Sequence, residues 1–530
     1  MFDFLFCKAL VYDGSGADPY IGDLAVEGDI IAEVAPVGAQ NVRRVIDAEG
    51  LALSPGFIDI HGHSDYYLLM NPTAQAKVRQ GVTTDVGGNC GYAAAPIGGV
   101  ELEERRSYYR DQFGLEIPFS RLDEYLSHVE DIGVSVNYAP LIGHNTVRAT
   151  VMGGSERPAG PDDLDRMDRL VDEGMREGAF GLSTGLVYAP ACFADRSELT
   201  ALCRTSSRHG GLLATHMRSE GAQLLEAIEE VIEIARDAAL PLQISHLKAA
   251  GEKNWDKLDA AFELIEGARS SGQDVTCDRY PYIASNTHLS ALLPDWVHNG
   301  QLEEKLARLR DPAIRGRIRS ELMETYSARD YWDRVLISRV HTEKNRFCEG
   351  LTVAGFAEKR GVDSPEAMMD LLAEEKLSVE ILIFMMNEEN MRRVLKKPYV
   401  MVGSDSAALT HDPPLGSGRP HPRNFGTFPA VLGNLARDEG LISFSEAIRK
   451  MTSAPCDRLG ITNRGRLAAG MKADLVLFDP ERILDTATYD EPVSYPAGIR
   501  MVLVNGEVVV EDGEHTGARP GRALRKWDSK

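Results

Sequence analysis

The sequence predicts an α/β fold: a (β/α)8 TIM-like barrel with a small β-sandwich domain built from both termini. Two patterns carry this prediction. The ends of the 530-residue chain are rich in strand signals, whereas the middle alternates between short apolar strands and segments with helical spacing. A doubly wound sheet would need a Gly-rich loop after its first strand, and no such loop is found. We therefore assign residues 1–55 and 456–530 to the β domain and residues 56–455 to the barrel.

Hairpin signals mark both ends of the chain. Near the N-terminus, two apolar runs flank Glu27-Gly28-Asp29. Near the C-terminus, a strand is expected at residues 473–478, and two valine-rich runs then flank Asn505-Gly506, a strong signal for a two-residue hairpin. Strands from both ends are expected to assemble into one β domain.

The middle of the chain repeats a strand-then-helix order, which favours parallel strands. One stretch, residues 294–398, is mostly charged and helical and is expected to be an elaboration between late barrel strands. The expected strands are residues 179–183, 213–216, 241–246 and 274–277, and the expected helices are residues 164–171, 224–235 and 256–269.

Charge and composition narrow the class of partner. The chain has 58 Lys and Arg against 80 Asp and Glu, a formal net charge of −22. An acidic surface repels phosphate backbones and anionic lipids, so neither nucleic acid nor a membrane is expected as a partner. The acidic net charge is still compatible with a small anionic ligand that binds in a locally basic pocket.

No apolar run is long enough for a membrane span, and no leader pattern is found, so a cytoplasmic location is expected. A homo-oligomer is compatible with the sequence, which does not decide the oligomeric state.

The sharpest local signal is a His-x-His motif, His61-Gly62-His63, that directly follows an apolar run. Side chains two residues apart in a strand point the same way, so both imidazoles are expected on one side. Gly62 removes bulk from the opposite face. At the C-terminal end of a first barrel strand, the pair is placed where metal sites are built.

Four further polar residues end predicted strands in the same way. Each is a weak signal alone, but the strand C-termini of a barrel converge on one mouth. Imidazole, thiolate and carboxylate together suit Zn²⁺. The four residues are Cys90, His216, His246 and Asp405.

This set of residues resembles the metal site of the amidohydrolase superfamily. Cys90 limits the resemblance to one family within that superfamily. Most binuclear members carry a carbamylated lysine at the bridging position. A cysteine there, within GGNCGYAAAP, resembles the N-acyl-D-amino-acid deacylase (D-aminoacylase) family. The matching segments also include GHNTVR (143–148), GLSTGLVYAP (181–190), THMRSE, ISHLK, DRYPY (278–282) and HPRNFGTFP (421–429).

The resemblance implies a metal site with one tightly bound zinc and a second site that is often weakly occupied. Cys90 would be able to bridge the two, and Asp405 would act chiefly as general base and acid. The implied ligands are Cys90, His216 and His246 for the tight site and His61, His63 and Asp405 for the adjacent one.

The resemblance also implies substrate contacts. Tyr188 is similar to the tyrosine that polarises the scissile carbonyl. Lys248, Tyr280 and Arg423 are similar to the residues that hold the substrate α-carboxylate or side chain. Two departures concern the loop on the substrate side: Ser406 follows Asp405 where the family often has glycine, and the gap from Asp405 to the HPR segment is long.

The expected function is zinc-dependent hydrolysis of N-acyl-D-amino acids to a carboxylate and a free D-amino acid. A cyclic amidase, like a dihydroorotase or hydantoinase, is the alternative, although those enzymes generally use the lysine that Cys90 replaces. A non-catalytic scaffold would be expected to have lost ligands, and a Cys-His protease needs a thiol free of metal. The sequence does not determine which amino-acid side chain and which acyl group the substrate carries. The apolar run at residues 381–386 weakly favours a hydrophobic side chain, but a barrel strand is the preferred interpretation of that run.

Overall fold

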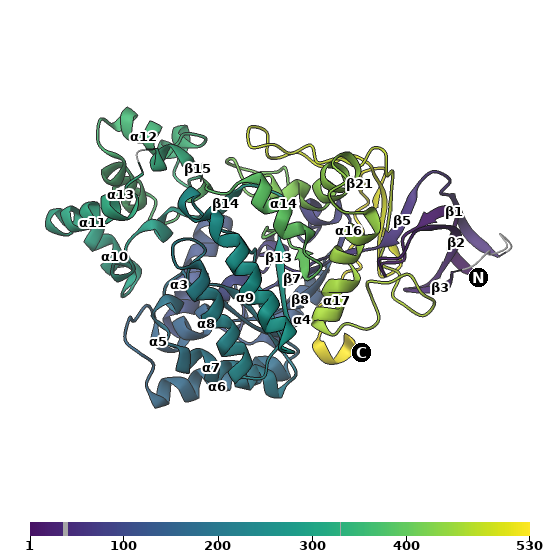
Figure 1. Cartoon of the computed structure of the whole chain (residues 1–530), viewed down its shortest axis with the longest axis horizontal. Helices are drawn as coiled ribbons and strands as arrows, with labels where there is room; N and C mark the ends of the chain where they lie inside the picture. The colour runs from purple at the N-terminus through teal and green to yellow at the C-terminus, as the bar shows by residue number, and fades with distance from the viewer. Residues whose placement is uncertain (35–40, 329, 530) are drawn as a thin grey trace.

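Parallel strands form the centre of the computed structural model, which describes residues 1–34, 41–328 and 330–529 (Figure 1). One parallel sheet has the order β17-β13-β12-β11-β10-β9, and another has the order β6-β7-β8. The first comprises β9 (Ile142–Gly143), β10 (Gly181–Gly185), β11 (Leu212–His216), β12 (Leu242–Ile244), β13 (Val275–Arg279) and β17 (Val400–Val402), and the second comprises β6 (Phe57–Asp59), β7 (Val82–Gly87) and β8 (Asn137–Pro140).

The parallel strands are covered by helices with one apolar face. In α6 (Pro161–Arg176), Met167, Val171 and Met175 recur at helical spacing and are buried, while the opposite face is charged. α8 (Leu224–Asp237) and α9 (Leu258–Ser270) follow the same rule, and α6 to α9 lie on one flank in Figure 1. The other helices that accompany these strands are α3 (Gly99–Phe113), α4 (Leu122–Ile132), α5 (His144–Met152), α7 (Arg196–Arg208), α14 (Glu388–Lys396), α15 (Arg423–Ala430), α16 (Phe444–Met451) and α17 (Ser453–Leu459).

Hydrogen bonds join the two parallel sheets at both of their edges. After β6 and β17, the Asp405 N–H donates to the His61 carbonyl at 2.7 Å, and the His63 N–H donates to the Ser406 carbonyl at 2.8 Å. At the other edge, the Phe180 N–H donates to the Pro140 carbonyl at 2.9 Å. The predicted α/β fold with parallel strands is confirmed, and the arrangement is consistent with a barrel.

Strands from the two chain ends share one sheet, as predicted. Its order is β21-β20-β19-β18-β5-β1-β2-β3, with β4 beside β1. Both predicted hairpins are present, as the antiparallel pairs β2–β3 and β19–β20. The strands are β1 (Phe2–Val11), β2 (Tyr20–Glu27), β3 (Ile30–Val34), β4 (Val42–Asp47) and β5 (Ala52–Pro55), then β18 (Leu475–Phe478), β19 (Ile499–Val504), β20 (Glu507–Glu511) and β21 (Glu514–His515).

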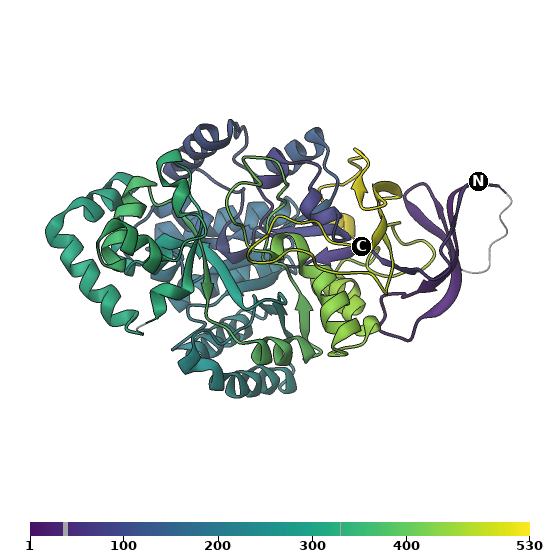
Figure 2. The ribbon, with the colours of Figure 1, turned by 90° about the horizontal axis from the view of Figure 1, so that it is seen from above.

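A separate small sheet has two strands, β15 and β16, within the region predicted to be an elaboration, and a third, β14, just before it. Its order is β14-β16-β15, all antiparallel, and it packs with helices α10 to α13 around a hydrophobic cluster of its own. In Figures 1 and 2 these helices lie at the end of the molecule opposite the terminal strands. The elements are β14 (Ala284–His288), β15 (Val335–Arg339), β16 (Glu380–Phe384), α10 (Leu302–Arg310), α11 (Pro312–Thr325), α12 (Val353–Arg360) and α13 (Ser364–Glu374).

This small sheet corrects one prediction. The apolar run at residues 381–386 was expected to be a barrel strand, but β16 pairs antiparallel with β14 and β15 and joins neither parallel sheet. An apolar run of this length indicates a buried strand but does not show which sheet it joins, because its partners are distant segments of the chain.

None of the helices in the described part of the chain has the length and apolar character needed to cross a bilayer.

We expect Gly506→Ala to destabilise the junction between the two chain ends. Gly506 has φ +81°, and a Cβ there would lie 1.9 Å from the carbonyl oxygen of Gly28, in the other hairpin. The left-handed backbone alone costs a non-glycine residue about 1–2 kcal/mol, and the overlap adds to this cost. The matched control is Gly513→Ala, with φ +80° and open space around it. In urea unfolding, Gly506→Ala should lose clearly more free energy of unfolding than Gly513→Ala. Equal losses would contradict the packing.

Candidate active site

The six predicted ligands all leave the C-terminal ends of parallel strands. His61 and His63 follow β6, Cys90 lies in a short turn (Asn89–Gly91) after β7, and His216 is the last residue of β11. His246 and Asp405 follow β12 and β17 within three residues. The His-x-His pair was expected within its strand, but β6 ends at Asp59, two residues earlier. The convergence of strand ends therefore brings all six side chains together.

These six residues form two clusters that share Cys90. His61, His63, Cys90 and Asp405 form one, and Cys90, His216 and His246 form the other. Within each cluster, one ligand atom from every residue lies within 4.8 Å of all the others. Cys90 is therefore the residue that connects the two clusters, at the place where the resemblance implies a bridging ligand.

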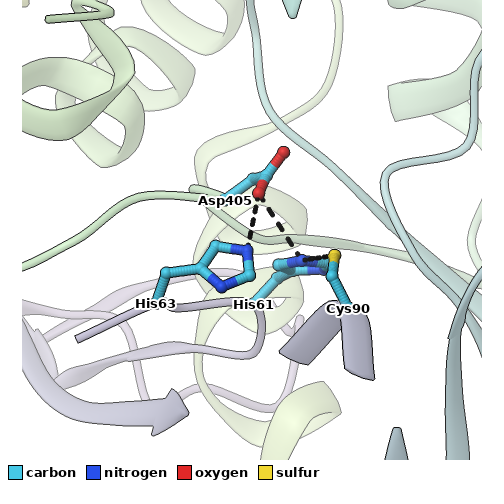
Figure 3. Close-up of side chains that lie close together, drawn as sticks. All are labelled: His61, His63, Cys90 and Asp405. Atoms are coloured by element: carbon cyan, nitrogen blue, oxygen red, sulfur yellow. Dashed lines mark hydrogen bonds and ion pairs between the residues drawn. The ribbon is translucent and has the colours of Figure 1, made fainter. Parts of the chain in front are cut away.

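Direct contacts link the members of the first cluster (Figure 3). The His63 Nε2 atom lies 2.9 Å from Asp405 Oδ1, and His61 Nε2 lies 3.3 Å from Cys90 Sγ. The Cys90 Sγ atom also lies 3.6 Å from His246 Nε2, in the second cluster. His61 and His246 thus turn Nε2 toward Cys90, and their Nδ1 atoms have partners outside the clusters.

The surroundings favour the anionic forms of Cys90 and Asp405. Burial alone would raise the pKa of Cys90, but the adjacent histidines, His61 first, hold it well below its ordinary value. Burial would likewise raise the pKa of Asp405, but Arg423 and the histidines hold it well below the usual range. Thiolates and carboxylates are the forms that bind metal, so the donor set fits Zn²⁺.

The backbone at these strand ends is strained. Cys90, His246 and Asp405 have φ values of +51°, +36° and +53°, in a region that residues with a Cβ rarely adopt. Such residues cost about 1–3 kcal/mol each and persist only where the surrounding structure holds them. The site therefore depends on contacts outside the ligands themselves.

Two carboxylates that the sequence analysis did not select orient the histidines. Asp278 Oδ1 lies 3.1 Å from His61 Nδ1, and it accepts a hydrogen bond from the His246 N–H at 2.8 Å. Glu220 Oε1 lies 2.8 Å from His246 Nδ1. Carboxylates in this position fix the tautomer and direction of ligating imidazoles. Both residues lie in segments that matched the family, DRYPY and THMRSE, so the signal was present without a role attached.

A buried lysine, also not selected from the sequence, lies beneath the site. Lys77 Nζ is fully buried and lies 2.6 Å from Asp59 Oδ2 and 3.0 Å from the Ser406 carbonyl. Asp59 Oδ1 accepts hydrogen bonds from the backbone N–H groups of Ser404, at 2.9 Å, and His61, at 3.3 Å. This ion pair thus ties the segment carrying His61 to the segment carrying Asp405.

Gly62 lies against Asp85, a buried carboxylate that also neighbours Lys77. A Cβ at Gly62 would lie 1.8 Å from Asp85 Oδ1. Burial raises the pKa of Asp85 to about 6, although Lys77, 3.5 Å away, opposes the rise. Gly62 was expected to remove bulk on the side opposite the two imidazoles, and Asp85 is the residue that occupies that space.

The predicted substrate-side residues also lie at the site. Tyr188 has its ring 5.0 Å from the ring of His216 and its hydroxyl 3.2 Å from Thr287 Oγ1. Arg423 Nη1 lies 2.8 Å from Asp405 Oδ2, and its guanidinium sits 4.8 Å from the centre of the Tyr280 ring. The buried Tyr280 hydroxyl has no hydrogen-bond partner among the described residues.

Lys248 has protein partners of its own. Its Nζ atom lies 2.8 Å from His246 Nδ1 and forms a short ion pair with Glu220. The resemblance implies that Lys248 holds the substrate, whereas its contacts in the structure are those of a buried salt bridge. Its charge still reaches the pocket, since Lys248 helps to lower the pKa of Tyr280, which burial alone would raise.

A large cavity opens over both clusters. Its volume is about 1360 Å³, and its lining includes Cys90, His216, Asp405, Tyr280 and Arg423. Ordinary ligand pockets have volumes of about 300–1,000 Å³. The cavity therefore has room for a substrate held over the clusters with one end at Arg423.

Comparisons with known proteins agree with this geometry. The model of the amidohydrolase family matches residues 44–510. D-aminoacylase of Alcaligenes xylosoxydans xylosoxydans is 36% identical, over 99% of this chain and 98% of its own. A solved D-aminoacylase, described as having a binuclear metal centre, is 35% identical with a TM-score of 0.84 and covers 99% of this chain and 100% of its own.

Two further solved structures bear on the substrate class. The N-acyl-D-glutamate deacylase of Bordetella bronchiseptica, complexed with zinc and a phosphonate mimic of the tetrahedral intermediate, is 31% identical. Its TM-score is 0.84, and the alignment covers 99% of each chain. An L-hydantoinase of Arthrobacter aurescens is 16% identical with a TM-score of 0.58, over 99% of this chain and 100% of its own, a likeness that shows the fold alone.

We expect Lys77→Met to destabilise the protein by about 3–5 kcal/mol, because it leaves the buried Asp59 carboxylate without its cation. The double variant Lys77→Met/Asp59→Asn should recover part of this loss, since it removes the unpaired charge. Urea unfolding measures both, with Lys359→Met, an exposed lysine, as the control. A Lys77→Met protein within about 1 kcal/mol of wild type would contradict the bridging role.

Proposed function

The chain belongs to the amidohydrolase family, and we propose that it hydrolyses the amide bond of N-acyl-D-amino acids to a carboxylate and a free D-amino acid. The observation that carries the proposal is the pair of clusters that share Cys90 beside the Arg423 cation. The D-aminoacylase and N-acyl-D-glutamate deacylase relatives support both the reaction and the D configuration.

The two clusters are proposed to supply the ligands of a metal cofactor. We propose that Cys90, His216 and His246 hold one zinc tightly and that the adjacent site takes a second metal weakly, with His61, His63 and Asp405 as its ligands. When bound, zinc lowers the pKa of water to about 7 and polarises a carbonyl. Asp278 and Glu220 keep the imidazole Nε2 atoms directed at the ion.

Asp405 is proposed as the residue that moves the proton. Its pKa lies well below the usual range, so the carboxylate is ready to accept a proton from the attacking water at neutral pH. The same carboxyl then donates that proton to the amide nitrogen, which makes the amine a viable leaving group. The Tyr188 ring lies beside His216, and its hydroxyl is proposed to donate a hydrogen bond to the scissile carbonyl oxygen.

Arg423 and Tyr280 are proposed to bind the substrate α-carboxylate. Guanidinium groups pair with carboxylates in a fixed geometry, and the unpartnered Tyr280 hydroxyl supplies a second donor. Lys248 is proposed to add positive charge at this subsite while its ammonium stays paired with Glu220. A protein of net charge −22 thus presents a local basic pocket to an anionic substrate.

The alternatives are less well supported. A cyclic amidase, like a hydantoinase, shares the fold with this chain but only 16% identity. A non-catalytic scaffold has no reason to keep six ligands in two clusters. A Cys-His protease would need Cys90 as a free nucleophile, whereas the thiol lies within reach of the histidines of both clusters.

We further propose that the parallel strands close into the eight-stranded barrel, in which β8 and β9, separated by one residue, count as one strand. The hydrogen bonds between the segments after β6 and β17 and those after β8 support closure. The mixed sheet of the two chain ends supports a small β domain of residues 1–55 and 456–530, and β14 to β16 with α10 to α13 support an elaboration at about residues 294–398.

The substrate class can be tested with a panel of N-acetyl-D-amino acids, their L enantiomers, hydantoins and dihydroorotate. We expect the D series to be preferred over the L series by about 100-fold or more, with the cyclic amides inactive. A chelator should abolish the activity and zinc should restore it, with about one or more zinc per chain in the purified protein. Faster hydrolysis of a hydantoin or dihydroorotate than of any N-acetyl-D-amino acid would overturn the proposal.

We expect Arg423→Ala to lower kcat/KM for N-acetyl-D-amino acids by about 30-fold or more, because the substrate carboxylate loses its charged partner. Arg419→Ala, an exposed arginine four residues earlier, is the matched control. For substrates whose carboxylate is replaced by a carboxamide, the Arg423 variant should lose much less, since no charge pair with the substrate is broken. A loss within about twofold on the carboxylate, under ~0.5 kcal/mol, would remove Arg423 from the substrate site.

A further inference from the structure

A group of tyrosines lines the cavity in addition to the proposed carboxylate-binding residues. We call Tyr66, Tyr92, Tyr108 and Tyr109 the tyrosine wall, and all four line the same cavity as Asp405 and Arg423. The rings of Tyr66 and Tyr109 stack at 4.2 Å, and the rings of Tyr108 and Tyr109 meet edge to face at 5.1 Å. Tyr66, Tyr108 and Tyr109 thus pack into one aromatic cluster, and Tyr92 lines the cavity beside Arg105.

The wall continues to the metal-ligand clusters. The Tyr92 ring lies 5.9 Å from the Tyr188 ring, which in turn lies 5.0 Å from His216. Tyr92 also donates a hydrogen bond through its hydroxyl to the Ala189 carbonyl at 3.1 Å. Tyr188 is therefore the point where the wall meets the reacting centre.

Most hydroxyls of the wall already have protein partners. The Tyr66 hydroxyl lies 3.3 Å from the Ala94 carbonyl oxygen, and the Tyr108 hydroxyl lies 3.4 Å from Ser378 Oγ. These contacts fix the rings and pair most of their hydroxyls, while the Tyr66 and Tyr109 rings are buried and stacked on each other. Such a surface favours an aromatic or apolar group over a charged one.

Two cations beside the wall, Arg105 and Arg339, each have a carboxylate partner, and for Arg339 this is Glu380 at 3.9 Å. Arg105 lies 6.0 Å from the Tyr92 ring centre, and its Nε atom donates to Glu101 Oε1 at 2.9 Å. Because a carboxylate already balances this guanidinium, the wall does not require an anionic ligand. An arginine beside aromatic rings also attracts the face of a further ring.

We propose that the tyrosine wall is the acyl-group subsite and that it takes a neutral aryl-containing acyl group such as phenylacetyl. This inference rests on the proposed function. If Tyr188 binds the scissile carbonyl oxygen, the acyl group attached to that carbonyl carbon begins beside Tyr188 and extends over its neighbour Tyr92. The cavity volume of about 1360 Å³ also exceeds what an acetylated amino acid would fill.

The test compares kcat/KM for the N-phenylacetyl and N-acetyl forms of one D-amino acid. We expect the phenylacetyl form to be preferred by about tenfold or more, since its ring becomes buried against the wall. Tyr109→Leu should reduce this preference by about fivefold or more. Tyr331→Leu is the matched control, because Tyr331 lines the same cavity from the region of the elaboration. If Tyr109→Leu does not fold, Tyr108→Leu takes its place.

A second measurement does not depend on turnover of a large substrate. Phenylacetate should inhibit hydrolysis of the acetyl substrate at a concentration about tenfold or more below that of acetate, and Tyr109→Leu should narrow this difference. An equal effect of both anions would overturn the subsite.

The remaining outcomes separate the failures. No preference for phenylacetyl, with acetyl substrates still hydrolysed, overturns the subsite and leaves the proposed function intact. A Tyr109→Leu protein that changes the preference among D-amino acids at constant acyl group shows that the wall binds the side chain, which also overturns the inference. Hydrolysis of no N-acyl-D-amino acid at all overturns the proposed function instead.

Discussion

The buried ion pair between Lys77 and Asp59 is the contact on which the site depends. It lies where the end of β6 meets the end of β17, and it bonds to backbone and side-chain groups on both sides. An unpaired buried charge is costly, so the pair holds only if both segments stay in place. Asp405, with φ +53°, sits between the two serines that this lysine contacts, and its strained backbone is held there.

The charged groups of the site contact one another in succession. Asp278 and Glu220 orient imidazoles, the imidazoles favour anionic Cys90 and Asp405, and these anions face the position of a cation. Arg423 links this centre to the substrate side, because it pairs with Asp405 and lies over Tyr280. The same arginine therefore lowers the pKa of the proposed base and belongs to the proposed carboxylate site.

Much of the site could be predicted from local sequence. The His-x-His pair and the strand-end Cys90, His216, His246 and Asp405 follow apolar runs, and strand ends of parallel sheets converge. The orienting carboxylates and Lys77 could not be selected in this way. Their partners are far along the chain, as with Asp278 and His61, and a buried Asp or Lys in isolation looks like any other charged residue.

The sequence by itself determined the alternation of strands and helices, the two terminal hairpins and the six candidate ligands, because each depends on local periodicity or on residue type. The tertiary structure decided which sheet β16 joins, that the ammonium of Lys248 is paired with Glu220, and that four tyrosines form one wall. These outcomes depend on pairings between segments distant in sequence, and local spacing carries no information about which distant segment packs beside it.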